Sequence, residues 1–128
     1  MLLAVPEDIP PECPLIKNRI LKTIGDKWTV LIIIALQKRT MRFNELKRAV
    51  GDISQQMLTL TLRQLERDGM VSRTVHPTVP PQVEYTLTPL GHSLYEPVNY
   101  LGRWAKTHMA EIESNRARYD GAAGVVAS

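Results

Sequence analysis

Apolar residues recur at helical spacing in the first third of the chain and predict two consecutive helices. A helix beginning at Pro14, tolerated in a first turn, ends at Gly25, and Asp26 is a good N-cap for the next. The second helix contains the run WTVLIIIAL (28–36), whose β-branched residues favour a strand locally. We predict a helix because the run follows a helix stop and a cap, and because a small α-rich domain needs an apolar central helix. The apolar face of the first helix consists of Leu15, Ile16, Ile20 and Ile24.

A helix-turn-helix pattern follows after a short extended piece at 40–43. Asn44 is the expected cap of a brief helix that ends at Gly51. Ser54 is the expected cap of a longer helix, which Gly69 terminates after Asp68. Two helices joined by a tight turn form this motif. The residues of the longer helix that should face the core are Leu58, Leu62 and Leu65.

Two stretches of alternating residues, 71–76 and 83–87, predict a β-hairpin. The connecting segment at 77–82 holds three prolines, which do not pair in a sheet, so it should form a stiff loop at the hairpin tip. A helix-turn-helix followed by a two-stranded β-hairpin wing is a winged helix. The fold class predicted is therefore mainly α (α+β), with extra terminal helices.

Thr88 and Pro89 begin a last helical region with one long apolar stripe. Pro97 should kink this region or split it in two. The stripe is longer than a small winged helix covers, which is typical of a surface that meets a partner. It consists of Leu90, Leu94, Val98, Leu101, Ala105, His108 and Ile112. The predicted organisation is an extended arm at 1–12, a winged helix domain at 13–118 and a flexible tail at 119–128.

The outward face of the helix after Ser54 has an unusual composition for a surface helix. It carries amides, a hydroxyl, a leucine and guanidiniums, the groups that recognise base edges and bind phosphates. Gln56 and Arg63 are the strongest candidates for base contacts, while Leu60 is either a thymine-methyl contact or an isolated surface leucine. The alternative for the whole face is a solvated polar surface. The full set of candidate DNA-binding residues is Ser54, Gln55, Gln56, Thr59, Leu60 and Arg63, with Arg42, Arg73 and Gln82 for backbone contacts.

The distribution of charge along the chain supports this interpretation more strongly than the net charge does. The chain of 128 residues has a net charge of +3. The segment 37–73 alone carries +4, which leaves −1 for the remainder. A basic segment around the candidate helix indicates either a nucleic-acid contact or a solvated basic face.

Other features narrow the class of protein. No motif of a hydrolase, metalloprotease or phosphate-binding loop is present, so we do not expect an enzyme or a bound cofactor. The three histidines lie far apart, which argues against a metal site. Trp28 and Trp104 are candidates for a small-molecule cavity or, more simply, for core packing. The single cysteine, the lack of a signal peptide and a longest apolar run of nine residues predict a cytoplasmic protein without a membrane span.

Several blocks, in order, resemble the HxlR-type family of bacterial winged-helix regulators, relatives of the MarR group. They are CPL (13–15), GDKW (25–28), RFNEL (42–46), ISQQMLTLTLRQLERDGMV (53–71) and PPQVEYTLTPLG (80–91). The resemblance implies a homodimeric transcriptional regulator on near-palindromic double-stranded DNA, with the Ser54-capped helix in the major groove and the hairpin loop near the minor groove. It also implies dimerisation through the first and last helices. The residues expected at that interface are Leu15, Ile16, Leu94, Val98, Leu101, Trp104, Ala105 and His108.

Two departures from the family pattern support a rival interpretation. Relatives often have a basic residue at the positions of Gln56 and Gln82. The loss of these charges is compatible with a winged-helix module that binds proteins instead of DNA.

Cys13 precedes the first helix, where a helix dipole lowers a thiol pKa. In some family members the cysteine at this place senses oxidants or electrophiles. The hypotheses for Cys13 are therefore a redox sensor and an inert buried thiol.

Overall fold

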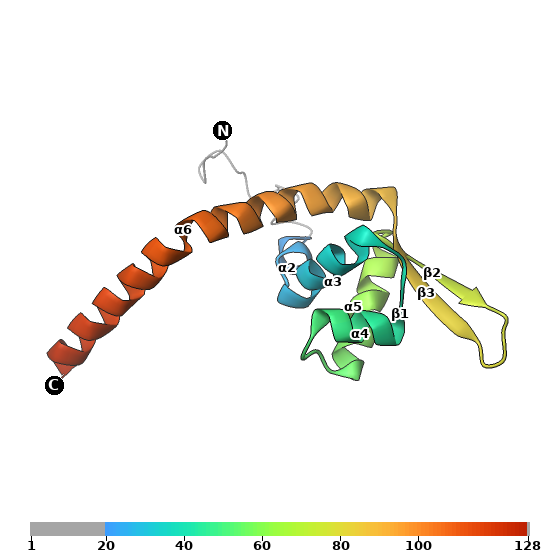
Figure 1. Ribbon diagram of the computed structural model, residues 1–128, viewed down its shortest axis with the longest axis horizontal. Helices are drawn as coiled ribbons and strands as arrows, with labels where there is room; N and C mark the ends of the chain where they lie inside the picture. Colours follow the sequence, from blue (N-terminus) through green and yellow to red (C-terminus); the bar gives the residue numbers. More distant parts are fainter. Residues whose placement is uncertain (1–19, 128) are drawn as a thin grey trace.

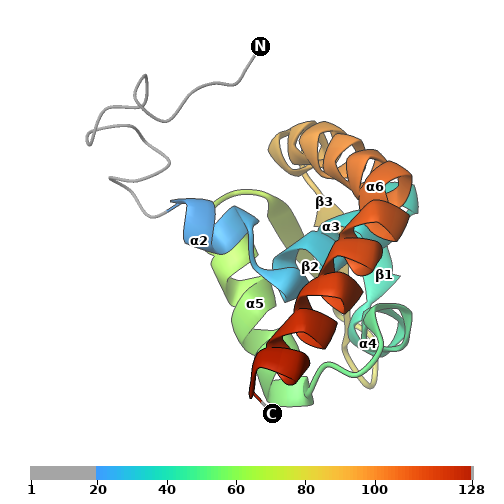
Figure 2. The ribbon, with the colours of Figure 1, turned by 90° about the vertical axis from the view of Figure 1, so that its left-hand side faces the viewer.

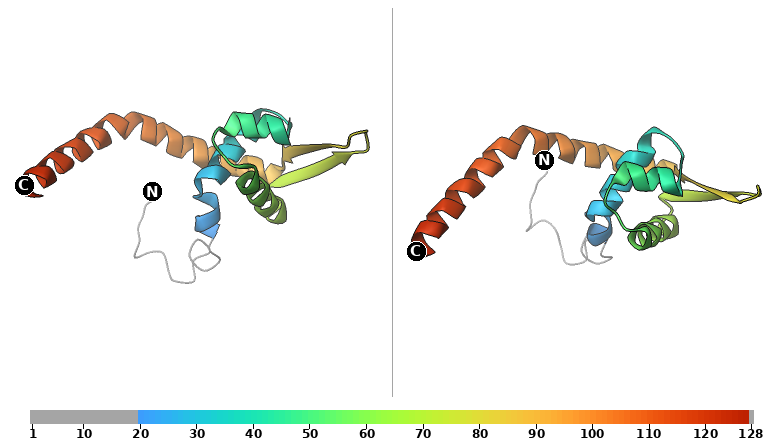
Figure 3. Two further views of the ribbon diagram at one scale, coloured as in Figure 1. Left: turned by 90° about the horizontal axis from the view of Figure 1, so that it is seen from below. Right: turned by 60° about the horizontal axis from the view of Figure 1, so that its bottom comes forward.

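The structure, a computed structural model, describes residues 20–127, and their side chains at positions 20 and 22–122. The helices and strands form a body beneath the first half of a very long C-terminal helix (Figures 1 and 2). A β-hairpin projects at one end of the molecule, and the second half of the long helix projects at the other (Figure 3). The elements in chain order are α2 (Ile20–Ile24), α3 (Lys27–Lys38), β1 (Met41–Arg42), α4 (Phe43–Val50), α5 (Gln55–Arg67), β2 (Val71–His76), β3 (Gln82–Leu87) and α6 (Pro89–Ala127).

The apolar run at 28–36 is helical, as predicted, and provides the centre of the core. The Asp26 carboxylate accepts hydrogen bonds from the backbone N–H groups of Trp28 at 3.0 Å and Thr29 at 3.1 Å, so it caps α3. Ile32 and Ile33 are fully buried. A helix supplies all its backbone hydrogen bonds internally, which suits a segment packed on several sides.

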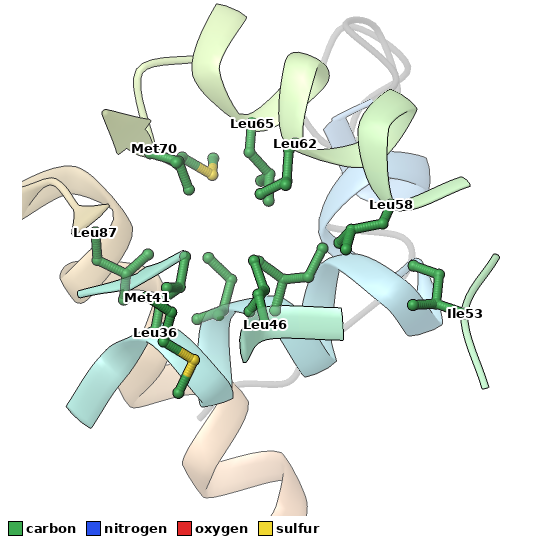
Figure 4. Packing of buried hydrophobic residues seen from close by; sticks show 12 residues of the cluster. Leu36, Met41, Leu46, Ile53, Leu58, Leu62, Leu65, Met70 and Leu87 are labelled. Atoms are coloured by element: carbon green, nitrogen blue, oxygen red, sulfur yellow. The ribbon is translucent and has the colours of Figure 1, made fainter. Parts of the chain in front are cut away.

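The core joins α3 to both helices of the helix-turn-helix and to the sheet (Figure 4). The predicted inward face of α5 is buried, since Leu58, Leu62 and Leu65 are at most 2% exposed. Leu46 of α4 and Leu87 of β3 enter the same cluster from other elements. The orientation of α5 is therefore set by packing on one face, which leaves the opposite face in solvent.

The sheet has three antiparallel strands in the order β1-β3-β2, one strand more than the predicted hairpin. The short extended piece before α4 pairs Met41 with Tyr85 of β3. Gln82, predicted in the loop, opens β3 opposite His76. The first pairing joins residues 44 positions apart, which the local residue pattern does not reveal, whereas the second extends the hairpin by one residue pair toward its loop.

Helix α4 begins at Phe43, so the prediction of Asn44 as its cap was wrong. The N-cap is Arg42, whose backbone N–H donates to the Glu45 carboxylate at 3.0 Å. This hydrogen bond, aided by the Arg39 guanidinium, lowers the pKa of the Glu45 carboxyl below its ordinary value. Because this pKa is lowered in the folded state, its contribution to stability is present above the ordinary pKa and is lost as the pH falls through the folded one.

Helix α6 is continuous and includes Pro97, so the region is not split in two. A proline removes one backbone hydrogen bond of a helix, and the turns on either side keep theirs. The helix also continues to Ala127, where we predicted a flexible tail from residue 119.

One residue connects the end of α5 to the start of α6. The Thr88 hydroxyl donates to the carbonyl oxygen of Gly69 at 2.6 Å, and the Thr88 backbone N–H donates to the carbonyl oxygen of Met70 at 3.1 Å. The same hydroxyl accepts the Gly91 N–H at 3.1 Å. These three hydrogen bonds, called the Thr88 clasp below, hold the turn after α5 against the first turn of α6.

The predicted arm, the first part of the first helix and three candidate residues lie outside the described residues. Those residues are Cys13, Leu15 and Ile16. Within residues 20–127, no helix is long and apolar enough to cross a membrane.

The contact between the start of α6 and the core leaves no room for a side chain at Gly91. A Cβ there would overlap the Met70 carbonyl oxygen and approach the Leu87 side chain, whereas a Cβ at Gly121, in the same helix, would meet nothing within 4 Å. We expect Gly91→Ala to lower the free energy of unfolding by about 2 kcal/mol. Gly121→Ala should leave it unchanged or raise it by about 0.5 kcal/mol. Urea unfolding followed by circular dichroism measures both, and equal effects would contradict the packing described.

Candidate nucleic-acid interface

The exposed face of α5 brings together most of the sequence-predicted site residues. Ser54 caps the helix, because its hydroxyl oxygen accepts the Met57 backbone N–H at 3.0 Å. The residues that follow form a shallow, open hollow with polar and apolar groups side by side. Its lining residues are Gln55, Gln56, Thr59, Leu60 and Arg63.

Thr59 and Leu60 have different surroundings within this hollow. The Thr59 hydroxyl donates to the Gln55 carbonyl oxygen at 2.9 Å, which fixes the hydroxyl and leaves its methyl group and its oxygen lone pairs for contacts. Leu60 is 50% exposed although it stands between two buried leucines of the same helix. An exposed leucine amid amides and a guanidinium provides the apolar contact that a thymine methyl group requires.

A second hollow lies between α5 and the sheet and contains the predicted Arg73. Arg73 of β2 stands directly opposite Tyr85 of β3, so both side chains share one sheet face. The lining of the hollow also includes Thr59 and Arg63. Arg63 therefore borders both hollows and links the helix face with the sheet. Glu66, which the sequence did not single out, lies in the same hollow and reduces its positive charge.

Arg42 and Gln82 form a separate group, at a third hollow between α4 and the start of β3, next to the hairpin loop. Arg42 is opposite Glu84 in the sheet register, and Gln82 starts the same strand. Arg48 of α4 also lines this hollow. Sequence reasoning counted Arg48 only in the charge of its segment, because six residues do not bring it to the helix face of Arg42 and no local signal marks it.

At the loop end of the hairpin, His76 and Glu84 form an ion pair or hydrogen bond. The His76 Nε2 and a Glu84 carboxylate oxygen lie 2.6 Å apart. His76 faces Gln82 in the register, and Glu84 faces Thr74, so the contact is a diagonal one across the two strands. It braces the strands just before the proline-rich loop at 77–81.

The residues predicted at a dimer interface lie on α6, partly over the body and partly beyond it. Leu94, Val98 and Ala105 are half-buried, whereas Leu101 is 67% and Trp104 52% exposed. His108 stacks on Trp104 with ring centroids 4.6 Å apart. An open apolar groove of about 380 Å³ separates this stretch from the body. It is lined by Ile24, Gly25, Val30, Ile34, Leu94, Pro97, Val98, Leu101, Gly102 and Ala105.

The two tryptophans lie on different helices. Trp28 packs against the core from α3, and the Lys27 ammonium lies 4.7 Å from its ring centroid. Trp104 lies on α6 and does not line the apolar groove. Among residues 20–122, no group of three or more potential metal-binding side chains comes together.

Comparisons with known proteins identify the same fold and family. A model of the HxlR-like helix-turn-helix family matches residues 23–113. The HTH-type transcriptional regulator YtfH of Escherichia coli is 42% identical over 101 residues, which cover 79% of each chain.

Two solved structures are similar throughout the winged helix. The transcriptional regulator YtfH from Salmonella typhimurium has a TM-score of 0.74 at 38% identity, with 84% of this chain and 95% of that chain covered. The redox regulator HypR in its reduced form has a TM-score of 0.71 at 40% identity, with 77% and 97% covered. With α5 as the second helix of the motif and β2–β3 as the wing, the chain belongs to the HxlR-like helix-turn-helix family of transcriptional regulators.

Proposed function

We propose that the protein is a dimeric, sequence-specific DNA-binding regulator that places α5 in the major groove. The observation that carries this proposal is the contrast between the two faces of α5. One face is locked into the core by leucines, and the other presents Gln55, Gln56, Thr59, Leu60 and Arg63 to solvent. A rigidly held helix with amides and a guanidinium at its outer surface provides bidentate partners for adenine and guanine.

The roles of these residues follow from their positions along the helix. Gln55, Gln56 and Thr59 are near the N-terminus of α5, the end that enters a groove most deeply. Arg63 contacts a base edge one turn later. The backbone N–H groups beside Ser54 bind a phosphate at the positive end of the helix dipole.

The sheet and α4 provide phosphate contacts on either side of α5. Arg73 lies beside Arg63 in the hollow between α5 and the sheet. Arg42 and Gln82 flank the hollow near the loop end of the wing, and this loop approaches the minor groove. Arg48 adds a positive charge in that hollow, where Gln82 lacks one and Glu45 is acidic. This charge favours the DNA-binding function over the rival protein-binding module, because two arginines and one glutamate leave the hollow with a positive charge.

A homodimer matches the two-fold symmetry of a near-palindromic operator, with each α5 in one half-site. The exposed apolar side chains of α6 support self-association, because monomers rarely expose a long apolar surface. We assign dimerisation to the apolar surface formed by α6 and the first helix. The site of action is the cytoplasm, where a lone cysteine remains reduced.

Cys13 responds to oxidants or electrophiles in this proposal. Support comes from the similarity to HypR, a redox regulator known in reduced and oxidised forms, at about 40% identity. Oxidation of the Cys13 thiol by disulfide formation or capping displaces the first helix, and this displacement changes the spacing of the two recognition helices.

Ser54 substitutions separate helix capping from DNA binding. Ser54→Ala removes the acceptor of the Met57 N–H and should cost about 1 kcal/mol of stability. Ser54→Asp keeps an acceptor, so its stability should be near that of the wild type. Its carboxylate would repel a phosphate, and DNA affinity should fall at least tenfold at low salt. Thermal unfolding and fluorescence anisotropy measure the two effects, and tight binding by Ser54→Asp would place the phosphate elsewhere.

Arg63→Ala tests base recognition. We expect it to weaken binding to the preferred operator by about 1–3 kcal/mol and to relax base preference at one position of each half-site. Binding of the wild type should also weaken steeply with salt, because phosphate contacts release counterions. DNA upstream of the protein's own gene serves as probe, with random duplex DNA as control. An equal loss on both duplexes would make Arg63 a phosphate contact.

Cys13→Ser tests the redox proposal. The variant should bind DNA like the reduced wild type and should lose any change in affinity caused by diamide or peroxide. Anisotropy titrations with and without oxidant, followed by dithiothreitol, measure this. The same oxidant response in both proteins, or in neither, would contradict a sensing role for Cys13.

A further inference from the structure

The hollow between α5 and the sheet brings two positive charges and one negative charge together on the candidate interface. Its volume is about 310 Å³, and the buried Leu62 is part of its lining. The charged residues of the lining are Arg63, Glu66 and Arg73. The proposed function uses both arginines and gives no role to Glu66, although an acidic group on a surface that meets DNA opposes binding.

Glu66 lies on the same face of α5 as Thr59 and Arg63. The three residues follow one another at intervals of four and three residues, the spacing of neighbours on a helix surface. Helix α5 contacts β2, and Arg73 of this strand lines the hollow from the other side. Tyr85, opposite Arg73 on β3, lines the same side. Glu66 therefore shares the hollow with one arginine of its own helix and one of the sheet.

The charge of Glu66 is not taken up by another part of the protein. Its side chain is exposed, and among residues 20–122 its carboxylate forms no ion pair. Glu45, the acidic residue of the hollow beside α4, is different, because its carboxylate accepts the Arg42 N–H at 3.0 Å and lies 3.3 Å from the Arg39 guanidinium. The Glu66 carboxylate thus acts on the groups that enter its hollow.

The three charges discriminate between two kinds of group on DNA. A phosphate held between the two arginines would also approach the Glu66 carboxylate, and like charges repel each other. A base edge is neutral, so Arg63 can turn out of the hollow to guanine without this repulsion. A complex with random DNA depends on phosphate contacts alone. Glu66 therefore opposes that complex more strongly than the complex with a preferred sequence.

We propose that Glu66 is a specificity-determining residue, which weakens binding to random DNA more than binding to the preferred operator. It disfavours a phosphate between Arg63 and Arg73, so that Arg63 is used for a base edge and Arg73 contacts a phosphate at the rim of the hollow. Specificity is a difference between two affinities, and a repulsive group that acts in the wrong complex increases it. This inference rests on the proposed DNA-binding function and adds the residue that separates its two modes.

Glu66→Gln removes the charge and keeps the length of the side chain. At low salt the variant should bind random duplex DNA about fivefold more tightly than the wild type, and the preferred duplex at most about twofold more tightly. On random DNA the slope of log K against log salt should also steepen by about 0.9, because one more phosphate is held. Fluorescence anisotropy measures both quantities. The probes are a random duplex and the duplex that the wild type enriches from a randomised pool.

Two further variants are matched controls. Glu66→Asp keeps the charge, so its discrimination between the two duplexes should stay within about twofold of the wild-type value. Glu113→Gln removes the same charge from an exposed position of α6 outside the candidate interface, so it should shift both affinities slightly and equally. All the exchanged side chains are exposed, and circular dichroism should give the same spectrum for every protein.

The alternative results lead to different conclusions. Equal tightening on both duplexes by Glu66→Gln would overturn this inference and leave the proposed function intact. Weaker binding of the preferred duplex alone would also overturn it, because Glu66 would then support Arg63 or accept a hydrogen bond from a base. If the wild type enriches no sequence from the pool, the proposed sequence-specific function fails, and this inference fails with it.

Discussion

The burial of one face of α5 is the constraint on which the rest of the structure depends. Leu58, Leu62 and Leu65 are removed from solvent by α3, α4 and the sheet, so α5 has no freedom to rotate about its axis without exposing them. Burying a leucine side chain contributes about 2 kcal/mol, and three of them make such a rotation costly. Every side chain on the opposite face therefore has a fixed direction, although none of them, Leu60 included, is held by packing of its own.

Much of this arrangement is predictable from periodicity and caps, because these are local properties. Asp26 and Ser54 are the caps expected from the sequence, and the leucines of α5 face inward as their spacing indicates. The cap of α4 was misplaced for a local reason, because Glu45 reaches back to the N–H group of Arg42. The third strand was not predicted because its pairing is nonlocal, with Met41 and Tyr85 44 positions apart. The separation of Arg42 from Arg73 into different hollows likewise depends on sheet pairing, which residue types alone do not determine.

Helix α6 combines two kinds of packing in one uninterrupted segment. Its first part contacts α3 and β3, and Gly91 permits the close approach to Met70 that begins this contact. Its second part leaves the body as the same uninterrupted helix. Periodicity predicted the apolar stripe, whereas composition predicted a flexible tail at residues where the helix continues.

The Thr88 clasp has a mechanical consequence. At about 1.5 Å per residue, α6 is a bent rod roughly 58 Å long, and the clasp together with the contacts to α3 and β3 holds its first half on the body. A sideways shift of a few ångströms at the distal end therefore corresponds to a tilt of several degrees at the point where the helix leaves the body. A motion of the distal end is therefore reduced when it reaches the winged helix, whereas a motion of the winged helix is enlarged at the distal end. Small thermal movements of the distal end hardly disturb the aim of α5, while a slight rotation of the winged helix swings the far end of α6 through a wide arc.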